Sequence, residues 1–252
     1  MKASISTGAI ALALLLSGCG GESGNGAGKS AGRGTPAPAV PAPNGGDWTQ
    51  IVQQTPEGGY RMGNPNAPVK LVEYASISCG HCAEFEEAAG EALRNNYVRT
   101  GRVSWEYRPF MIFPTDLGIF MLLQCRGPQT FFQLTDQLYA DQRNWLGKLQ
   151  ALSPAQQQQL GAMQPQQQIP ALVQATGMDQ FFRQRGMPEA QISSCLANQQ
   201  SLQQLMNVTS TGSSEYKVTG TPTFFINGEL VDLTPGEIWP QVEPALRKAV
   251  GG

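Results

Sequence analysis

The sequence predicts an α/β protein in which a helical region separates a strand–helix–strand half from a hairpin–helix half. Residues 69–74 and 103–107 are rich in β-branched and aromatic residues, and a helical pattern lies between them. Asn227-Gly228 stands between two short apolar runs and is the strongest two-residue signal for a β-hairpin. Between these halves, residues 114 to about 216 show helical periodicity.

The N-terminus has the pattern of an export signal. Residues 1–18 contain a short apolar stretch at 10–16, too short to span a bilayer, followed by small residues before Cys19. Leu16-Ser17-Gly18-Cys19 resembles the lipobox of bacterial lipoproteins, which predicts lipidation of Cys19. An ordinary secretory peptide with an unrelated cysteine is the alternative. Gly20, where an aspartate would by family analogy indicate inner-membrane retention, slightly favours the outer membrane of the bacterial envelope.

Residues 19–46 are predicted to be a lipidated cysteine followed by a flexible tether. Gly, Ser, Ala, Pro and Asn dominate this stretch, so it has too few large apolar side chains to offset the entropy of ordering. The net charge is −2 and no basic cluster occurs, so nucleic-acid binding is not expected. No other segment has membrane-spanning length, and we expect membrane contact through the lipid alone.

Five cysteines constrain the covalent framework: Cys19, Cys79, Cys82, Cys125 and Cys195. Lipidation of the first would explain the odd number. Among the possible pairings of the other four, local reach favours Cys79 with Cys82, and elimination leaves Cys125 with Cys195. Two separate buried thiols are the alternative for the second pair. Zinc, and a metal in general, is not expected, because a second C-x-x-C motif or histidine pair is missing.

The motif Cys79-Gly80-His81-Cys82 follows the first predicted strand directly. A turn-rich stretch at 63–68 precedes that strand, and after the motif apolar residues recur at helical spacing, with Ser78 as the N-cap candidate. Cys79 should therefore lie in the first turn of a helix. A second strand at 103–107 would complete a right-handed parallel unit.

Within the helical region, residues 117–123 are apolar nearly all round, which predicts a buried helix that carries Cys125 inward. The glutamine-rich stretch 156–168 follows a capping box at Ser153 and is predicted to be helical, with a disordered spacer as the alternative. A last helix is predicted to begin at Thr234-Pro235, and Pro240 and Pro244 should kink or break it.

The placement of Cys79 at a helix N-terminus suits disulfide exchange, in which the thiolate is the reactive species. Unpaired N–H groups of the first turn and the helix dipole would stabilise this anion and lower its pKa. His81, if protonated, would add a favourable charge. A stabilised Cys79 thiolate favours the dithiol, so the Cys79–Cys82 disulfide would be an oxidant. An inert disulfide is the alternative, but so short a loop stabilises little.

Residues 71–82 (LVEYASISCGHC) and 220–228 (GTPTFFING) together resemble the DsbA-like branch of the thioredoxin superfamily over about residues 48–250. The resemblance implies a thioredoxin-like domain at 47–113 and 206–252, interrupted by a helical insertion at 114–205. It also implies a cis bond at Thr221-Pro222 beside the active-site disulfide, with backbone groups that hold a substrate. A proline that merely starts a strand is the alternative. The resemblance further implies that a Cys125–Cys195 disulfide would be structural.

Glu73 lies six residues before Cys79, where DsbA-like relatives have a buried acid near the second cysteine. The resemblance implies that Glu73 exchanges a proton with Cys82, and an exposed strand glutamate is the alternative. Gly80-His81 differs from the Pro-His of strongly oxidising relatives and is similar to protein disulfide isomerase. Thr221 is likewise similar to isomerase-type relatives. Oxidase and isomerase directions therefore stay open.

The expected function is that of an oxidoreductase without a cofactor, which transfers a disulfide from Cys79–Cys82 to unfolded or reduced exported proteins. The family implies reoxidation by a quinone-linked, DsbB-type membrane protein. We expect a monomer that faces the periplasm. A disulfide isomerase, which would need a dimer, and a reductase are the alternatives with the same chemistry. A chaperone-like binding lipoprotein is the alternative from another class.

Overall fold

The computed structural model describes residues 38–251. The predicted signal peptide, Cys19 and most of the predicted tether lie outside the described residues. The last part of the predicted tether is bound to the folded domain, because the Val40 amide donates to the Thr100 carbonyl over 2.9 Å and the Trp48 indole N–H donates to the Val40 carbonyl over 2.7 Å. No helix in residues 38–251 has the length and apolar character needed to cross a bilayer.

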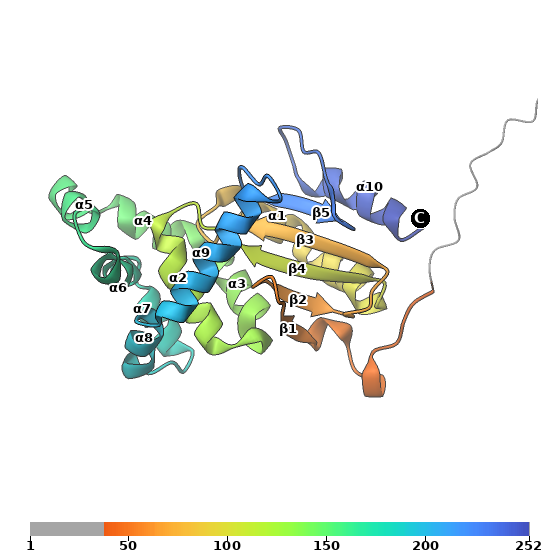
Figure 1. Cartoon of the computed structure of the whole chain (residues 1–252), viewed down its shortest axis with the longest axis horizontal. Coiled ribbons are helices and arrows are strands. Elements are labelled where there is room, and N and C mark those ends of the chain that lie inside the picture. The colour runs from red at the N-terminus through yellow and green to blue at the C-terminus, as the bar shows by residue number, and fades with distance from the viewer. Residues whose placement is uncertain (1–37, 252) are drawn as a thin grey trace, which may run out of the picture. The chain divides into compact units, whose positions relative to one another are not determined.

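A six-stranded sheet lies at the centre of the described structure, in the order β1-β2-β4-β3-β5-β6 (Figure 1). The central pair β3 and β4 is parallel, as the strand–helix–strand pattern predicts, and all other neighbours are antiparallel. The strands are β1 (Val52–Gln54), β2 (Tyr60–Gly63), β3 (Val69–Ala75), β4 (Val103–Pro109), β5 (Thr223–Ile226) and β6 (Glu229–Leu230).

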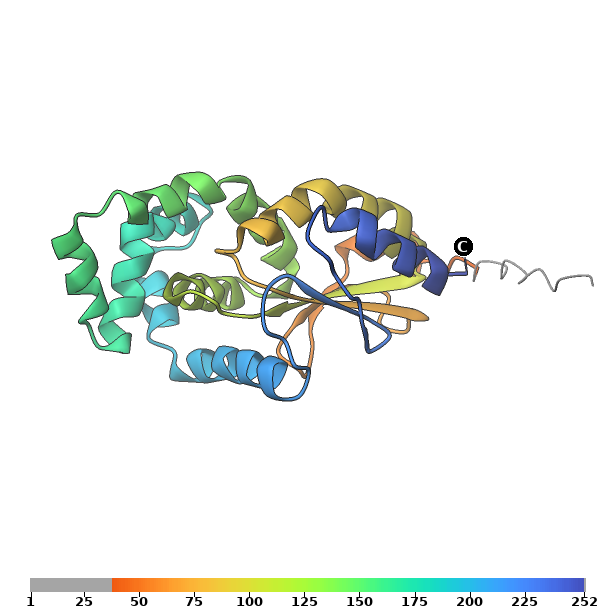
Figure 2. The ribbon, with the colours of Figure 1, turned by 90° about the horizontal axis from the view of Figure 1, so that it is seen from above.

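Helices cover the two faces of the sheet unequally. Helices α1 (Gly80–Ala92) and α10 (Trp239–Ala249) lie on one face, and α9 (Gln199–Ser214) lies on the other (Figure 2). Side chains of a strand alternate between faces. Leu71 of β3 accordingly belongs to the main core, whereas Val72 and Tyr74 belong to a smaller cluster on the α9 face. This alternation places Glu73 and Tyr74, which have different polar partners, on opposite faces of the sheet.

The region between β4 and β5 is helical, as its periodicity predicts, and the glutamine-rich stretch is helical as well. In α2, residues 118–123 are all buried, as the apolar pattern predicts. The helix does not carry Cys125 inward as predicted, because Cys125 lies in the last turn of α2 and is exposed there; a disulfide joins it to Cys195 of α8. The capping box of Ser153 with Gln156 is also present. The helices are α2 (Pro114–Arg126), α3 (Phe131–Ala140), α4 (Gln142–Gln150), α5 (Pro154–Gly161), α6 (Pro165–Thr176), α7 (Met178–Gln184) and α8 (Glu189–Leu196).

Two helix starts differ from the prediction. The N-cap of α1 is Cys79 and not Ser78, because the Ser78 amide donates to Asp116 Oδ1 over 2.9 Å and its hydroxyl pairs with Thr115. Helix α10 begins at Trp239 and not at Thr234, whose amide and hydroxyl donate to the side chain of Gln241.

The two prolines of α10 have different effects on the helix. Pro240 occupies the first turn of the helix, where a missing N–H removes no internal hydrogen bond. Pro244 lies inside α10, which continues through it to Ala249, so the predicted break does not occur.

Candidate active site

The start of α1 places two sulfur atoms at the end of the central strand β3. Cys79 caps the helix, is 6% exposed, and has an extended backbone conformation (φ −82°, ψ 120°). Cys82 lies one turn further, has no exposed surface, and faces the core. Both residues carry free thiols, so the structure represents the dithiol form. The outer sulfur is therefore the one that a substrate can reach.

The surroundings of Cys79 favour its thiolate. Hydrogen bonding from the Cys82 thiol lowers the pKa of Cys79 to about 6, although burial acts in the opposite direction. The backbone N–H groups of Cys82 and His81 also lower this pKa, and so does the Thr221 side chain, which can donate to the anion. These amides belong to the first turn of α1, which has no carbonyl partners for them. An ordinary cysteine has a pKa of about 8.5 and is mostly protonated at neutral pH.

The loop before β5 brings Thr221 and Pro222 to the other side of Cys79. The bond between them is cis, and the Cys79 thiol donates to the Thr221 carbonyl over 3.2 Å. This contact favours the neutral thiol. The Thr221 hydroxyl is buried, has no hydrogen-bond partner in residues 38–251, and can donate to Cys79 once the thiolate forms. Thr221 thus contacts the reacting sulfur in both protonation states.

The imidazole of His81 is largely exposed and pairs with an acidic neighbour on α1. Its Nδ1 pairs with Glu84 Oε2 at 2.9 Å, and the imidazole is 74% exposed. The hydrogen bond to Glu84 raises the pKa of His81, which favours the imidazolium. Because Glu84 balances that charge, His81 affects the Cys79 thiolate more through its backbone N–H than through its ring.

Glu73 is buried beneath the motif, as the resemblance implies. It is 2% exposed, and its Oε2 accepts the indole N–H of Trp105 over 3.0 Å. Burial raises the pKa of Glu73 well above its usual value, and the charge of Glu86 raises it further. Burial likewise raises the pKa of Cys82, and both Cys79 and Glu73 contribute in the same direction. Glu73 and Cys82 are thus two buried groups for which burial favours the neutral form.

A charged group borders this buried acid on its outer side. Arg94 lies 5.2 Å from the ring centre of Trp105 and forms ion pairs with Glu86 at 2.8 Å and Asp136 at 2.7 Å. Burial raises the pKa of Asp136 to about 7, with a further contribution from the charge of Glu86. The indole of Trp105 thus separates Glu73 from a paired arginine, and Glu73 itself forms no ion pair within residues 38–251.

The helical region holds the loop between β3 and Cys79, a role that the sequence analysis missed. Asp116, in the first turn of α2, has no exposed surface and accepts the Ser76 hydroxyl and the Ser78 amide, both over 2.9 Å. It also accepts the amides of Ile112 and Phe113. The Pro-Thr-Asp start of α2 is a helix N-terminus signal that could have pointed to this residue.

Two further side chains of the helical region bind carbonyls of the same loop. The Gln142 amide donates to the carbonyls of Ile77 and Cys79, over 2.8 and 2.9 Å. The Tyr139 hydroxyl donates to the Ser76 carbonyl over 3.1 Å. Both side chains are buried. No pattern in the sequence indicates them, because their partners are more than 60 residues away along the chain.

Comparison with known proteins identifies the family. The family described as thioredoxin matches residues 55–243. The chain belongs to this family. The thioredoxin-like fold predicted from the two motifs is therefore confirmed. Among residues 38–251, no group of three or more His, Cys, Asp or Glu side chains could hold a metal ion.

Solved structures with this fold include DsbA-like oxidoreductases. A protein-disulfide isomerase from Novosphingobium aromaticivorans is 29% identical, covers 76% of this chain and 97% of its own, and gives a TM-score of 0.72. The α-DsbA1 protein of Wolbachia pipientis is 19% identical, covers 78% of this chain and 92% of its own, with a TM-score of 0.60, and shows the fold alone.

Curated relatives are longer than the matched region. A Rickettsia prowazekii protein with the provisional name protein-disulfide oxidoreductase is 25% identical over 71% of this chain and 58% of its own length. A Rickettsia felis protein of the same provisional name is 26% identical over 66% of this chain and 52% of its own. The chain thus spans little more than half the length of these relatives.

We predict that alkylation of the reduced protein by iodoacetamide follows an apparent pKa of about 6, because hydrogen bonds to Cys79 stabilise its thiolate. The Cys82→Ala variant should move this apparent pKa upward, since it removes the thiol that contributes most. Stopped-flow rates between pH 4 and 10 measure both values. A wild-type value near that of a free cysteine, about 8.5, would contradict this assignment.

We predict that Glu73→Gln slows disulfide exchange about 10²-fold by removing the proton exchanged with Cys82. The same substitution should raise the free energy of unfolding at alkaline pH, although it slows the reaction. Because the pKa of folded Glu73 is raised, the folded state keeps a proton that the unfolded state loses above about pH 4.3, and wild-type stability falls as pH rises. The amide that replaces the carboxyl group in the variant cannot titrate.

Urea unfolding of the reduced proteins at pH 4 and pH 8 tests the stability part. The variant should be the more stable protein at pH 8, with little difference at pH 4. Equal pH dependence in both proteins would show that Glu73 is an ordinary carboxylate.

Proposed function

We propose that this protein is a thiol:disulfide oxidoreductase that transfers a disulfide from Cys79–Cys82 to thiols of exported proteins. The observation that carries the proposal is the pairing of a Cys79 thiol whose pKa is lowered to about 6 with a buried Cys82 whose pKa is raised. These opposite shifts give the two sulfur atoms different roles. A stabilising disulfide would need neither an anion-binding site nor a buried acid beside it.

The reaction starts from the Cys79–Cys82 disulfide. A substrate thiolate attacks Sγ of Cys79, the S–S bond breaks, and the electron pair goes to Cys82, which leaves as a thiolate. Burial makes this thiolate costly, and the neutral carboxyl group of Glu73 can supply its proton. The product of this step is a mixed disulfide between Cys79 and the substrate.

A second thiolate of the substrate then attacks the substrate sulfur of the mixed disulfide. The bond to Cys79 breaks, and Cys79 leaves as the thiolate that α1 and Thr221 stabilise. Two substrate thiols are thereby oxidised to one disulfide, and the protein is reduced to the dithiol that the structure represents. Because Cys79 is a stable leaving group, the equilibrium favours this direction.

Isomerisation is the second candidate function, and two observations favour it. The Gly80-His81 dipeptide is similar to that of protein disulfide isomerase, and the solved structure that is 29% identical is named a protein-disulfide isomerase. An isomerase would use the same attack by Cys79 on a wrong disulfide, without net oxidation. The low pKa of Cys79 suits both reactions, and the reduction potential separates them.

The cellular setting is part of the proposal. The export signal, a lipidated Cys19 and a periplasmic position agree with disulfide exchange, because disulfides persist outside the cytosol. Continued oxidation needs an acceptor for the two electrons, for which we propose a quinone-linked membrane protein of the DsbB type.

We predict that Cys82→Ser accumulates mixed disulfides between Cys79 and exported proteins, because the Cys79 thiolate can still attack a substrate disulfide but no Cys82 sulfur remains to displace the substrate from Cys79. Non-reducing gel electrophoresis after acid quenching of cells detects them. Cys79→Ser is the matched control and should trap none. A Cys79→Ser variant that keeps full activity in preventing aggregation, together with a Cys82→Ser variant without adducts, would instead indicate a chaperone-like binding protein.

We predict that the Cys79/Cys82 couple is more oxidising than thioredoxin, whose potential is about −270 mV, because the dithiol form contains the stabilised thiolate. Equilibration with glutathione buffers, followed by alkylation and mass spectrometry, measures the potential. A value near or above roughly −120 mV identifies an oxidase, and one near roughly −180 mV identifies an isomerase. A value at or below that of thioredoxin would support the reductase alternative.

A further inference from the structure

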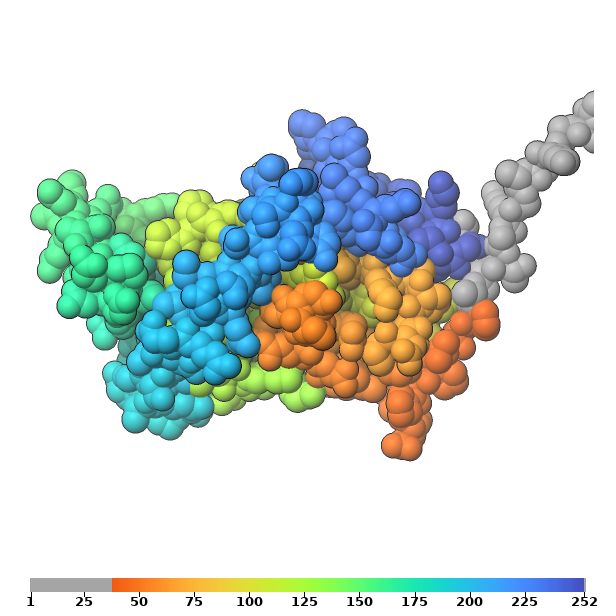
Figure 3. All heavy atoms as spheres, in the orientation of Figure 1, coloured from red at the N-terminus to blue at the C-terminus, as the bar shows by residue number. Residues whose placement is uncertain are grey.

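The face of the sheet opposite α1 has a polar hollow that the disulfide chemistry does not use. This face is turned toward the viewer in Figure 3, where α9 covers only part of it. A cavity of about 490 Å³ lies over β3, β4 and β5, and its lining includes Arg61, Lys70, Arg108 and Tyr216. We call it the sheet-face hollow. A neighbouring cavity of about 630 Å³ shares Arg108 and Tyr216 with it.

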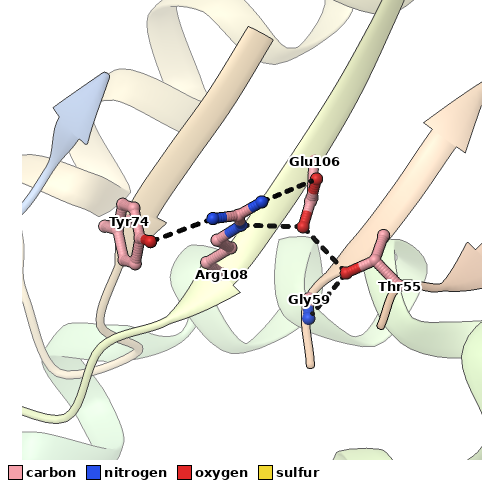
Figure 4. A network of polar contacts seen from close by, with 5 residues as sticks. All are labelled: Thr55, Gly59, Tyr74, Glu106 and Arg108. Carbon is pink, nitrogen blue, oxygen red and sulfur yellow. Dashed lines mark hydrogen bonds and ion pairs between the residues drawn. The ribbon is translucent and has the colours of Figure 1, made fainter. Parts of the chain in front are cut away.

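A buried arginine forms the floor of the sheet-face hollow. Arg108 is 7% exposed, and its guanidinium lies 5.5 Å from the ring centre of Tyr74 and 5.4 Å from that of Tyr216. It donates to Glu106 and to the Tyr74 hydroxyl, as Figure 4 shows. These bonds use three of its five N–H groups, and the others have no hydrogen-bond acceptor within residues 38–251.

The carboxylate beside this arginine accepts three hydrogen bonds from within the chain. Glu106 accepts two bonds from Arg108, and its Oε1 also accepts the Thr55 hydroxyl over 2.8 Å (Figure 4). Burying an ion pair costs desolvation energy that is often as large as the attraction between the two charges. A gain in stability alone therefore does not explain the buried pair of Glu106 and Arg108. Because Glu106 and Arg108 balance each other, the remaining charges decide which ligand the hollow suits.

Those remaining charges are mainly positive. Arg61 and Lys70 line the hollow and form no ion pair within residues 38–251. Apart from Glu106, the only acidic residue in the described lining is the exposed Glu57. The Arg61 Nε is buried and has no hydrogen-bond partner in the same residues. A buried donor without a partner is costly and suits an acceptor from outside the chain. The hollow therefore suits an anion.

The remaining walls are largely apolar and aromatic, with Ser104 and Asn227 as polar members. Phe225 of β5 and Val72 of β3 line the hollow, and Tyr216 covers it with 38% of its surface exposed. A volume of about 490 Å³ is in the range of small-ligand pockets, which combine apolar walls with a few convergent polar groups. We propose that the sheet-face hollow binds a carboxylate attached to an aromatic or branched aliphatic group, with the carboxylate at Arg61 and Lys70 and the apolar group against Tyr216 and Phe225.

This site is independent of the disulfide exchange proposed above, because the sheet lies between the hollow and the cysteines. Consecutive residues of β3 point to opposite faces of the sheet. Glu73 faces Trp105 under α1, whereas Tyr74, the next residue, belongs to the floor of the hollow. The same ligand chemistry could come from a free aromatic acid or from the C-terminal residue of a peptide. Both carry one carboxylate and one apolar group.

Isothermal titration of the full chain with N-acetyl-L-phenylalanine tests the proposal, and N-acetyl-L-phenylalaninamide is the uncharged control. The acid should bind saturably, at least tenfold more tightly than the amide, and more weakly at high salt. The tripeptide Gly-Gly-Phe and its C-terminal amide distinguish the two sources. Tighter binding of the tripeptide acid than of the acetylated residue would identify a peptide terminus, and the reverse would identify a free acid.

Variants at the rim of the hollow locate the binding. Arg61→Gln and Lys70→Gln should each weaken binding of the acid threefold to tenfold, and Tyr216→Ser should weaken acid and amide alike. Lys248→Gln, an exposed lysine on α10, is the matched control and should bind as wild type. All four variants should keep the wild-type rate of disulfide exchange. Equal binding of acid and amide to the wild type, or undiminished binding in both rim variants, would overturn the proposal.

Discussion

The position of one sulfur atom at the start of α1 constrains the rest of the domain. For Cys79 to receive N–H groups from the first turn, the chain must leave β3 at Ala75 and enter the helix within four residues. Such a short connection has few internal hydrogen bonds of its own, so its polar groups need partners elsewhere. Asp116, Tyr139 and Gln142 provide these partners from the helical region. The inserted helices therefore hold the reactive loop in addition to enlarging the core.

Burial gives the second sulfur and the acid beneath it their properties. Cys82, Glu73 and Tyr107 are all shielded from water, and burial raises the pKa of each, so all three tend to stay neutral. A neutral set of donors can lie under a thiolate without repelling it. A second anion in the same place would raise the pKa of Cys79. Trp105 contributes to this arrangement, since its indole N–H satisfies Glu73 without adding a charge.

The features predicted from the sequence are those whose signals are local. The β3–α1 connection, the hairpin at Asn227 and the buried helix around Leu122 all depend on neighbours within a few residues. Strands β1 and β2 were missed, because these short strands, which contain Gln53 and Arg61, lack clear alternation. Strand β2 forms by pairing with the distant β4, and β1 pairs with β2 at the edge of the sheet. Gln142 was missed for the same reason, since its partners lie more than 60 residues away.

The alternation of side chains along the central strands explains how one sheet can carry two unlike polar regions. On β3, Glu73 pairs with Trp105 on one face and Tyr74 pairs with Arg108 on the other; on β4, Tyr107, which pairs with Tyr139, and Arg108 divide in the same way. A shift of β3 by one residue would move the neutral acid Glu73 to the charged face, and a shift of β4 by one residue would move Arg108 beneath the thiolate. The register is therefore fixed by electrostatics on both faces as well as by packing. This explains why charged residues are tolerated in the two most central strands.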